Sequence, residues 1–535
     1  MPTPGSLRTA LAGAALAMSA AVAAPVSTDS ASSPALSPAY WATPHAVTTH
    51  GEVTVGGRPI RYTADAGTLV LRDPQGRPTG AMFYVAYFRE GADARRPITF
   101  LYNGGPGSSS APLHIGAFGP VRVVTVDHDR TPPAPYSLIA NAYSLLDASD
   151  LVFVDAMGTG FSRILGASAG GVGAPEAFYG VDSDARSFTH FINLFLSKYG
   201  RWNSPKFLIG ESYGTTRSAA VAYRLEQQGI DLNGIVLLST ILNFDIGVVD
   251  QPNVNPGVNL PYALALPSYA AVAWYQNALP ARPPALRLWL GRVQSWATGP
   301  YLAALGEGSE LPPAEASEIA AQMSRFTGLG TSYLLRADLR VTGPQFEHQL
   351  LLERGEATGQ LDGRFTGPAM DPMAAASAYD PVIAAIGSPY VSAINAYLRG
   401  TLRFGGMAPY EILSDSIAED WNPLHVPPGQ SAPAGTATNV MPDLAAAMIL
   451  DPHLKVMVNA GYFDLTTPYY AAVYQMHQLP MPRELQRNIR YCFYRTGHMI
   501  YLDPAALAQL HANIVSFIRS ADGGPPNAAA QIGRP

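Results

Sequence analysis

The chain has 535 residues, of which 47% are hydrophobic and only 14% are charged, so a substantial core can form without metal or disulfide staples. The formal net charge of -6 excludes the basic footprint of a nucleic-acid-binding protein and offers no polybasic contact for a membrane. A single cysteine, Cys492, excludes an internal disulfide and a zinc site built from several cysteines.

The first residues have the pattern of an export signal. Arg8 and the amino terminus precede an alanine-rich apolar run over 9–22, and Ala21-Val22-Ala23 fits a small-x-small cleavage site. We therefore predict a signal peptide over 1–23, a periplasmic or secreted protein, and a flexible leader over 24–44. About 14 apolar residues are too few to span a membrane, and no later run reaches about 18, so we expect no span in the mature chain.

The next part of the chain changes from one strand pattern to another. Alternating polar and apolar residues over 52–89 predict antiparallel strands. Short apolar strands then alternate with amphipathic helices, which is typical of βαβ units and a mostly parallel sheet. The predicted strands are 98–102, 150–155, 206–209 and 235–238, and the predicted helices are 182–198, with Asp182 as its N-cap, and 215–227.

This alternation of strands and helices stops over 244–440, which is rich in Pro, Ala, Tyr and Gly and contains helical patterns at 314–326 and 389–399. It returns with strands over 454–458 and 489–494 and a last helix over 504–519. We predict one α/β domain with a mostly parallel central sheet flanked by helices. Its two parts are 45–243 and 441–520, separated by an inserted helical cap over 244–440 and followed by a frayed tail over 521–535.

The sequence Gly210-Glu211-Ser212-Tyr213-Gly214 is a G-x-S-x-G pattern. The pattern alone is weak in a glycine-rich chain, but here it follows a predicted strand and opens a predicted helix, as a nucleophile elbow requires. The serine would lie at a helix N-terminus, where the helix dipole favours developing negative charge. The alternative interpretation is an ordinary glycine-rich turn.

A serine nucleophile needs a general base and an acid that orients it, and in this arrangement they follow the serine in the order acid, then histidine. Asp464 and His498 each come just after a predicted strand, where open α/β sheets place their chemistry. His453 precedes its strand, and His477 and His511 lie in helical stretches, so they suit the role less well. A purely structural role for Asp464 or His498 is the alternative.

A second glycine-rich turn, Asn103 to Ser110, follows the strand at 98–102. A serine nucleophile needs two amide donors for the tetrahedral oxyanion. One is the amide of Tyr213, after the nucleophile, and Gly105 suits the other because its backbone can approach closely. A phosphate-binding loop is excluded, since the turn has no G-x-G-x-x-G pattern and no lysine after its glycines.

Together these motifs resemble the serine carboxypeptidase family (peptidase family S10) over about residues 50–520. The segments that carry the resemblance are Asn103-Gly-Gly-Pro-Gly-Ser-Ser109, the elbow around Ser212, the Asp464 loop, Gly497-His498, Asn141-Ala-Tyr-Ser-Leu145 and Asp155-Ala-Met-Gly-Thr-Gly-Phe-Ser162. Phe326-Thr-Gly-Leu329 and Tyr333-Leu-Leu-Arg336 resemble the bacterial branch of that family.

The resemblance implies an α/β-hydrolase fold with a helical cap and the removal of one residue from a peptide that has a free C-terminal carboxylate, without a cofactor or metal. It implies that Ser212 attacks the scissile carbonyl, His498 is general base and then acid, and Asp464 orients His498. The amides of Gly105 and Tyr213 would form the oxyanion hole.

The resemblance also implies that Asn103, Gly104 and Glu211 hold the substrate's terminal carboxylate. A carboxylate beside Glu211 is tolerable only if Glu211 is protonated and donates a hydrogen bond, which predicts better peptidase activity in mild acid. Three departures from the family pattern matter, and one of them is Asp155-Ala156-Met157 in place of the usual Asp-Pro pattern. Ser108 replaces a common cysteine, and Ala117 replaces an acidic residue that could share a proton with Glu211.

Two other kinds of function stay open at this point. An esterase or acyltransferase would use the same triad with another acceptor. A catalytically idle binding protein of the same fold is disfavoured, because Ser212, Asp464 and His498 are all present. An aminopeptidase of the proline-releasing type also has a Gly-Gly-Pro-Gly loop, but that loop begins with His rather than Asn103. The sequence specifies no oligomeric state.

Overall fold

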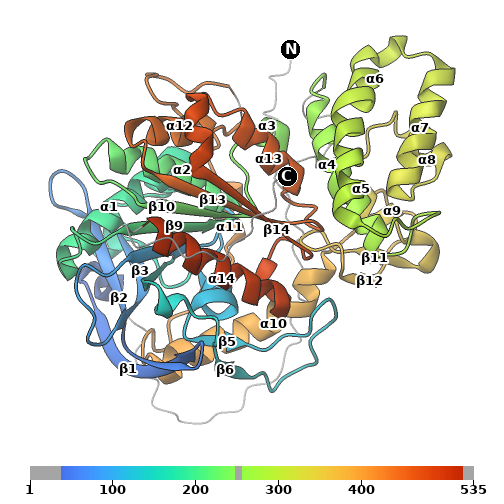
Figure 1. Cartoon of the computed structure of the whole chain (residues 1–535). Helices are drawn as coiled ribbons and strands as arrows, with labels where there is room; N and C mark the ends of the chain where they lie inside the picture. The colour runs from blue at the N-terminus through green and yellow to red at the C-terminus, as the bar shows by residue number, and fades with distance from the viewer. Residues whose placement is uncertain (1–37, 248–255, 436, 522–535) are drawn as a thin grey trace, which may run out of the picture.

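The strands of the computed structural model form one large sheet and two small ones (Figure 1). The structure describes residues 38–247, 256–435 and 437–521, so the predicted signal peptide over 1–23 and nearly all of the predicted tail lie outside it. In the described part, the large sheet has the order β1-β2-β3-β7-β4-β9-β10-β13-β14, and β8 pairs with β3.

The strands of the large sheet are β1 (Ala46–Val55), β2 (Arg58–Arg72), β3 (Pro78–Arg89), β4 (Ile98–Tyr102), β7 (Asp150–Val154), β8 (Arg163–Ile164), β9 (Lys206–Glu211), β10 (Gly234–Leu238), β13 (Lys455–Gly461) and β14 (Ile489–Tyr494). The small sheets pair β5 (Val121–Val123) with β6 (Leu138–Ala140), and β11 (Glu356–Thr358) with β12 (Thr366–Pro368).

The sheet has an antiparallel part and a parallel part. β1, β2 and β3 pair antiparallel, and β3 pairs antiparallel with β7. From β7 through β4, β9, β10 and β13 to β14, every neighbouring pair is parallel. Because helices cover both faces here, β4, β7, β9 and β10 are buried along their whole length and are mostly apolar. The predicted mostly parallel sheet is confirmed.

Alternate side chains of each central strand point to opposite cores. In β9, Phe207 and Ile209 join one core with α10 (Pro381–Ala396) and α14 (Pro504–Ala521). Leu208 joins the other core with α1 (Val181–Tyr199), α2 (Tyr213–Glu226) and α12 (Met441–Leu450). The predicted N-cap of α1 was wrong: Gly180 is the cap, and the Asp182 carboxylate instead accepts a hydrogen bond from the Val426 amide at 3.0 Å.

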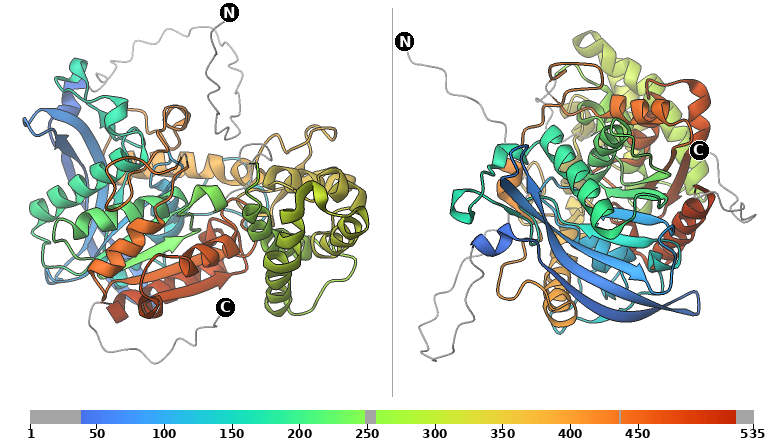
Figure 2. Two further views of the ribbon diagram at one scale, coloured as in Figure 1. Left: turned by 90° about the horizontal axis from the view of Figure 1, so that it is seen from above. Right: turned by 90° about the vertical axis from the view of Figure 1, so that its left-hand side faces the viewer.

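The predicted insertion over 244–440 divides between two packing environments. Its first part forms a helical module with its own apolar core, beside the rest of the molecule (Figures 1 and 2). The later part returns to the sheet, where Val382, Ile386 and Ile394 of α10 lie in the same core as α14. The module contains α4 (Leu260–Tyr275), α5 (Leu286–Trp296), α6 (Leu302–Glu307), α7 (Pro313–Thr327), α8 (Thr331–Arg336) and α9 (Gly343–Gln349). The other short helices are α3 (Phe244–Gly247), α11 (Asp415–Glu419) and α13 (Tyr469–His477).

One stretch of the described residues, Pro381–Thr401, is long and apolar enough to cross a membrane by length and composition alone. It includes α10, and 56% of the tested window is buried inside the molecule, where its apolar side chains contribute to the core shared with α14.

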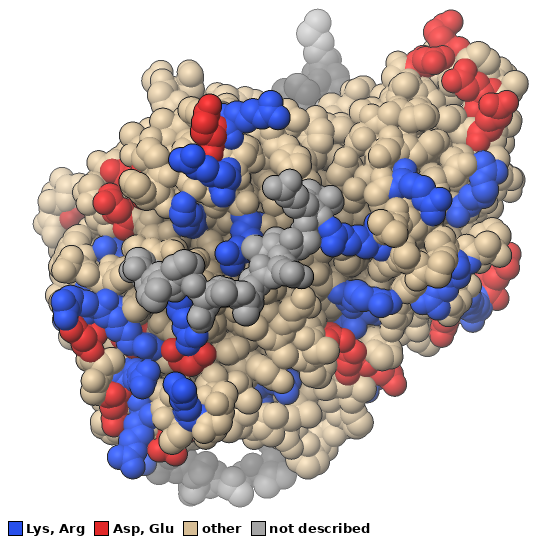
Figure 3. Space-filling model, viewed as in Figure 1, with Lys and Arg blue, Asp and Glu red and all other residues tan. Residues whose placement is uncertain are grey.

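On the face seen in Figure 3, Lys and Arg are interspersed with Asp and Glu, with uncharged surface between them.

The predicted flexible leader over 24–44 is too long at its C-terminal end. Residues Pro38–Ala42 form a short 3₁₀-helix, and the Trp41 side chain is only 6% exposed. Its ring lies 6.3 Å from the ring of Phe161 and 6.5 Å from that of Phe404, so this segment belongs to the core. Trp41 is a large apolar residue in a segment rich in Ser, Ala and Pro, and this was the sequence signal that the end of the segment is packed.

We expect Trp41→Ala to lower the free energy of unfolding by about 3–5 kcal/mol, because truncating a buried aromatic removes apolar burial and leaves a cavity. Trp202→Ala is the matched control, since Trp202 is 47% exposed and its truncation should change stability by no more than about 0.5 kcal/mol. Urea unfolding followed by circular dichroism measures both. Equal effects would show that Trp41 does not anchor the segment.

Candidate active site

The predicted site residues gather at one edge of the sheet because the strands that carry them are parallel. Asn103 follows the end of β4, Ser212 the end of β9, Asp464 the end of β13 and His498 the end of β14. Parallel strands present their carboxyl ends at a common edge, where α/β proteins bind ligands. β10 lies between β9 and β13 and ends at Leu238, in the middle of this arrangement.

Ser212 occupies the turn between β9 and α2 with φ 60° and ψ -129°, a backbone conformation that is unusual for a residue with a side chain. Such a turn requires small neighbours. A Cβ at Gly210 would overlap the carbonyl oxygen of Gly214, so only glycine fits there. The Ser212 amide donates to the Leu238 carbonyl at 2.9 Å. The local geometry is that of a nucleophile elbow.

Asp464 and His498 form a buried hydrogen-bonded pair. His498 Nδ1 lies 2.9 Å from Asp464 Oδ2. The carboxylate is fully buried and is fixed by the amides of Thr466 and Thr467, both 2.9 Å from Oδ1, and by the Thr467 hydroxyl, 2.7 Å from Oδ2. Since a carboxylate can only accept, Nδ1 carries a proton and Nε2 of a neutral His498 is free to accept another.

The electrostatic surroundings of His498 favour its cationic form. Burial by itself lowers the pKa of the imidazole, but the Asp464 carboxylate, through its charge and hydrogen bond, and the charges of Glu211 and Asp380 reverse this effect. The net pKa of His498 is raised above its ordinary value of 6.5. A histidine with this partner can take up a proton during a reaction and hold it.

The loop after β4 packs directly on the elbow. A Cβ at Gly104 would overlap the amide nitrogen of Tyr213, so glycine is required for this approach. Gly105 has φ +104°. Among the described residues, neither the Gly105 amide nor the Tyr213 amide has a hydrogen-bond acceptor. These are the two donors that the sequence predicts for an oxyanion.

Glu211 is 3% exposed and lies between the elbow and the histidine loop. Burial raises its pKa to about 7, although the nearby His498 and hydrogen bonds from Tyr501 and Asn103 act in the opposite direction. The Tyr501 hydroxyl donates to Oε1 at 3.2 Å. Oε2 is buried and has no hydrogen-bond partner within the described residues. A carboxyl group in this environment is substantially protonated at neutral pH.

The structure places the predicted residues as follows. Asp464 and His498 are joined by a hydrogen bond, and Glu211 interacts with the charge of His498 and with Asn103 through a hydrogen bond. No hydrogen bond joins Ser212 to His498 in the described residues, so that link of the triad stays a prediction. Two consecutive residues at the end of β10 nevertheless bond to them. The Leu238 carbonyl accepts a hydrogen bond from the Ser212 amide, and the Ser239 hydroxyl donates one to the His498 carbonyl at 2.6 Å.

The loop between β11 and β12 holds the loop that carries His498, and no pattern in the sequence predicts this contact. The Gly497 amide donates to Asp362 Oδ2 at 3.0 Å, and the His498 amide donates to the Leu361 carbonyl at 2.6 Å. The neighbouring Gln360 carbonyl accepts the amide of Leu465, next to Asp464. The loops that carry Asp464 and His498 are therefore both fixed by one short segment of the predicted insertion.

Arg217, one turn into α2, ties the elbow to the loop after β4. Its side chain is 1% exposed, and Nε donates to Asp184 Oδ2 at 2.7 Å while Nη1 donates to the Asn103 carbonyl at 2.6 Å. The guanidinium also lies 4.4 Å from the centre of the Phe188 ring. A charged residue on an otherwise buried, alanine-rich helix face was the sequence signal that could have identified it.

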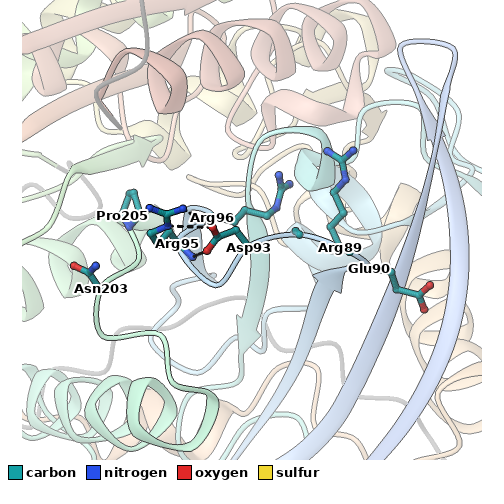
Figure 4. A pocket seen from close by; sticks show the side chains of 9 residues that line it. Arg89, Glu90, Asp93, Arg95, Arg96, Asn203 and Pro205 are labelled. Atoms are coloured by element: carbon teal, nitrogen blue, oxygen red, sulfur yellow. Dashed lines mark hydrogen bonds and ion pairs between the residues drawn. The ribbon is translucent and has the colours of Figure 1, made fainter.

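A surface hollow elsewhere is unrelated to this site. It lies before the starts of β4 and β9, at the opposite edge of the sheet (Figure 4). Two of the arginines that line it are paired, Arg95 with Asp93 and Arg96 with Asp150. Within the described residues, no group of three or more His, Cys, Asp or Glu side chains is placed to hold a metal ion.

Comparisons with known proteins bear on the family and the fold of this chain. Residues 70–250 match the sequence model of the serine carboxypeptidase family, Peptidase S10. No curated protein matches the chain. Among solved structures, the chain is similar to Kex1(Δ)p, a prohormone-processing carboxypeptidase from Saccharomyces cerevisiae, with a TM-score of 0.51 and 14% identity over 86% of this chain and 91% of the yeast chain.

Two further structures match less closely. A putative aryl esterase from Burkholderia cenocepacia has a TM-score of 0.35 and 12% identity over 85% of this chain and 98% of its own. A proline iminopeptidase from Mycobacterium smegmatis has a TM-score of 0.31 and 13% identity over 89% of this chain and 99% of its own. The fold is that of an α/β hydrolase, and the family match supports the predicted serine carboxypeptidase family.

We expect Arg217→Met to lower the free energy of unfolding by about 3–5 kcal/mol, because it leaves the Asp184 carboxylate buried without its partner. The double variant Asp184→Leu/Arg217→Met removes both charges and should be clearly more stable than Arg217→Met alone. Urea unfolding of the three proteins checks this. Additive losses in the double variant would contradict the assigned pairing.

Proposed function

We propose that the protein is an exported serine carboxypeptidase of the bacterial branch of the S10 family, which releases C-terminal residues from peptides. The observation that carries the proposal is the buried Glu211 carboxyl immediately before the nucleophile, with a pKa raised to about 7. Hydrolysis of an ester needs no such group, whereas a buried neutral carboxyl group can donate a hydrogen bond to a terminal carboxylate. The family match over residues 70–250 supports the same activity.

The proposed reaction has two halves. The Ser212 hydroxyl attacks the scissile carbonyl carbon while its proton passes to His498 Nε2, and the amides of Gly105 and Tyr213 stabilise the resulting oxyanion. His498 then gives that proton to the leaving amine, which departs as the released C-terminal residue. Water attacks the acyl-enzyme with His498 again as base, and Ser212 is regenerated. Asp464 holds the imidazole in the required tautomer and stabilises its cation.

Glu211 and Asn103 would bind the terminal carboxylate of the peptide. A neutral Glu211 can donate a hydrogen bond to that carboxylate, whereas an ionised one repels it. Since the pKa of Glu211 is about 7, binding should be favoured below that pH and decline above it. The base His498 must be neutral, and its raised pKa sets the acidic limit. Because the pKa of His498 lies above 6.5 and that of Glu211 is about 7, the resulting working range is narrow and close to neutral pH.

The decisive experiment compares one peptide as a free acid, as its C-terminal amide and as a small ester substrate. Mass spectrometry of the products shows which end is trimmed. A carboxypeptidase should trim the acid far faster than the amide. Equal cleavage of acid and amide would rule out the exopeptidase, and activity on the ester alone would favour the esterase or acyltransferase alternative.

Ser212→Ala should reduce release of C-terminal residues by roughly 10⁴-fold or more, because no nucleophile remains for the acyl-enzyme. Ser197→Ala, at an exposed position of α1, is the control and should retain full activity. Turnover of a peptide acid by both variants measures this. A Ser212→Ala protein with substantial activity would exclude the acyl-enzyme mechanism.

Glu211→Gln should abolish the rise of KM for peptide acids above neutral pH, because the amide does not titrate and still donates a hydrogen bond. It also removes a negative charge that raises the pKa of His498, so the acidic limb of kcat should move to lower pH. Glu226→Gln is the matched control, since burial also raises the pKa of Glu226 to about 7, but that residue ends α2 away from the site. An unchanged KM profile in Glu211→Gln would refute the carboxylate-binding role.

A further inference from the structure

Tyr501 is the side chain that fixes the Glu211 carboxyl from the side of the histidine loop. It lies in the short 3₁₀-helix Ile500–Leu502, three residues after His498, and is 2% exposed. Its hydroxyl donates to Glu211 Oε1 at 3.2 Å. Burial raises the pKa of Tyr501 well above its ordinary value of 10, so the hydroxyl keeps its proton and stays a donor at every working pH.

The five titratable and polar groups that face Glu211 come from four places in the fold. Asn103 follows β4, Asp464 follows β13, His498 and Tyr501 follow β14, and Tyr390 comes from α10. Among the described residues, Tyr390 makes no hydrogen bond to Glu211, and no second carboxyl group donates to it. Position 117, where a partner acid was expected from the family pattern, holds a buried alanine.

We propose that Tyr501 is a specificity-determining positioning residue: it makes Glu211 Oε1 the accepting oxygen and so leaves Oε2 as the oxygen that donates to a peptide's terminal carboxylate. This inference rests on the proposed carboxypeptidase function. A neutral carboxyl group has one carbonyl oxygen, which accepts, and one hydroxyl oxygen, which donates. Because Tyr501 donates to Oε1, the acid proton belongs on Oε2, the oxygen that has no hydrogen-bond partner among the described residues.

The same hydrogen bond has a consequence for pH dependence. A donor stabilises an ionised carboxylate more than a neutral carboxyl group, so Tyr501 lowers the pKa of Glu211 against the effect of burial. Removing the hydroxyl should therefore keep Glu211 neutral to higher pH. Peptide acids should then bind over a wider alkaline range, but with the acid proton free to lie on either oxygen.

The test is to compare Tyr501→Phe with the wild-type full chain on a peptide acid, its C-terminal amide and a small ester from about pH 5 to 9. We expect the alkaline rise of KM for the peptide acid to move upward by roughly half a pH unit or more. We also expect the preference for acid over amide at low pH to fall, while ester kcat changes little. Circular dichroism and the unfolding midpoint verify that the variant is folded.

Two controls separate positioning from a general structural effect. Tyr390→Phe removes another buried hydroxyl that faces Glu211 without removing a hydrogen bond to it, so its KM profile should match the wild type. In a Glu211→Gln background, Tyr501→Phe should no longer shift the alkaline limb, because the carboxyl group whose pKa Tyr501 lowers is gone.

The outcomes are distinct. An alkaline limb that stays in place or moves downward in Tyr501→Phe, with wild-type trimming of peptide acids intact, overturns this inference and leaves the proposed function standing. A uniform loss on acid, amide and ester at every pH assigns Tyr501 a merely structural role and also overturns it. If the wild type trims no peptide acid while it hydrolyses the ester, the proposed function and this inference fall together.

Discussion

The parallel register from β4 through β9 and β10 to β13 and β14 is the constraint on which the rest of this molecule depends. It pairs Tyr102 with Gly210, Leu238 with Glu211 and Gly461 with Tyr494, so the strands end almost level. Each turn that leaves this edge carries one part of the site. A shift of one residue in any pair would point the following side chains to the opposite face. The elbow, the glycine-rich loop and the acid–histidine pair are compatible only in this register.

The proposed chemistry depends on two buried groups, Glu211 and His498, each of which changes the pKa of the other. An ionised Glu211 raises the pKa of His498, and a cationic His498 lowers the pKa of Glu211. Peptide cleavage as proposed needs both groups neutral, whereas their mutual attraction favours both charged. Coupled groups of this kind titrate as a pair, so the pH limits of activity would belong to both residues together. Tyr501 lowers the pKa of Glu211 by donating a hydrogen bond to it, and Asp464 raises the pKa of His498 by accepting one from it. Both partners therefore favour the charged forms.

The site is also held from outside the sheet. Two residues of the segment between β11 and β12 accept hydrogen bonds from the histidine loop. The Asp362 carboxylate accepts from the Gly497 amide, and the Leu361 carbonyl accepts from the His498 amide. Arg364, 3% exposed, pairs with Asp362 at 2.7 Å and reaches Thr496 at 2.9 Å. This arrangement couples the packing of the inserted region to the position of His498, the proposed general base. It also explains why the insertion divides in two: part forms the helical module, and part is built into the support of the site.

The sequence by itself determined the features that arise from neighbouring residues. These are the antiparallel start, the short buried strands, the glycine-flanked turn at Ser212 and the polar residues that follow strand ends. Only the tertiary structure decided which distant side chains meet. Tyr501 reaches Glu211 across 290 positions of the chain, and Asp362 reaches Gly497 across 135. Periodicity and turn chemistry act over a few residues, whereas such contacts depend on how every intervening helix and strand packs, which no local pattern encodes.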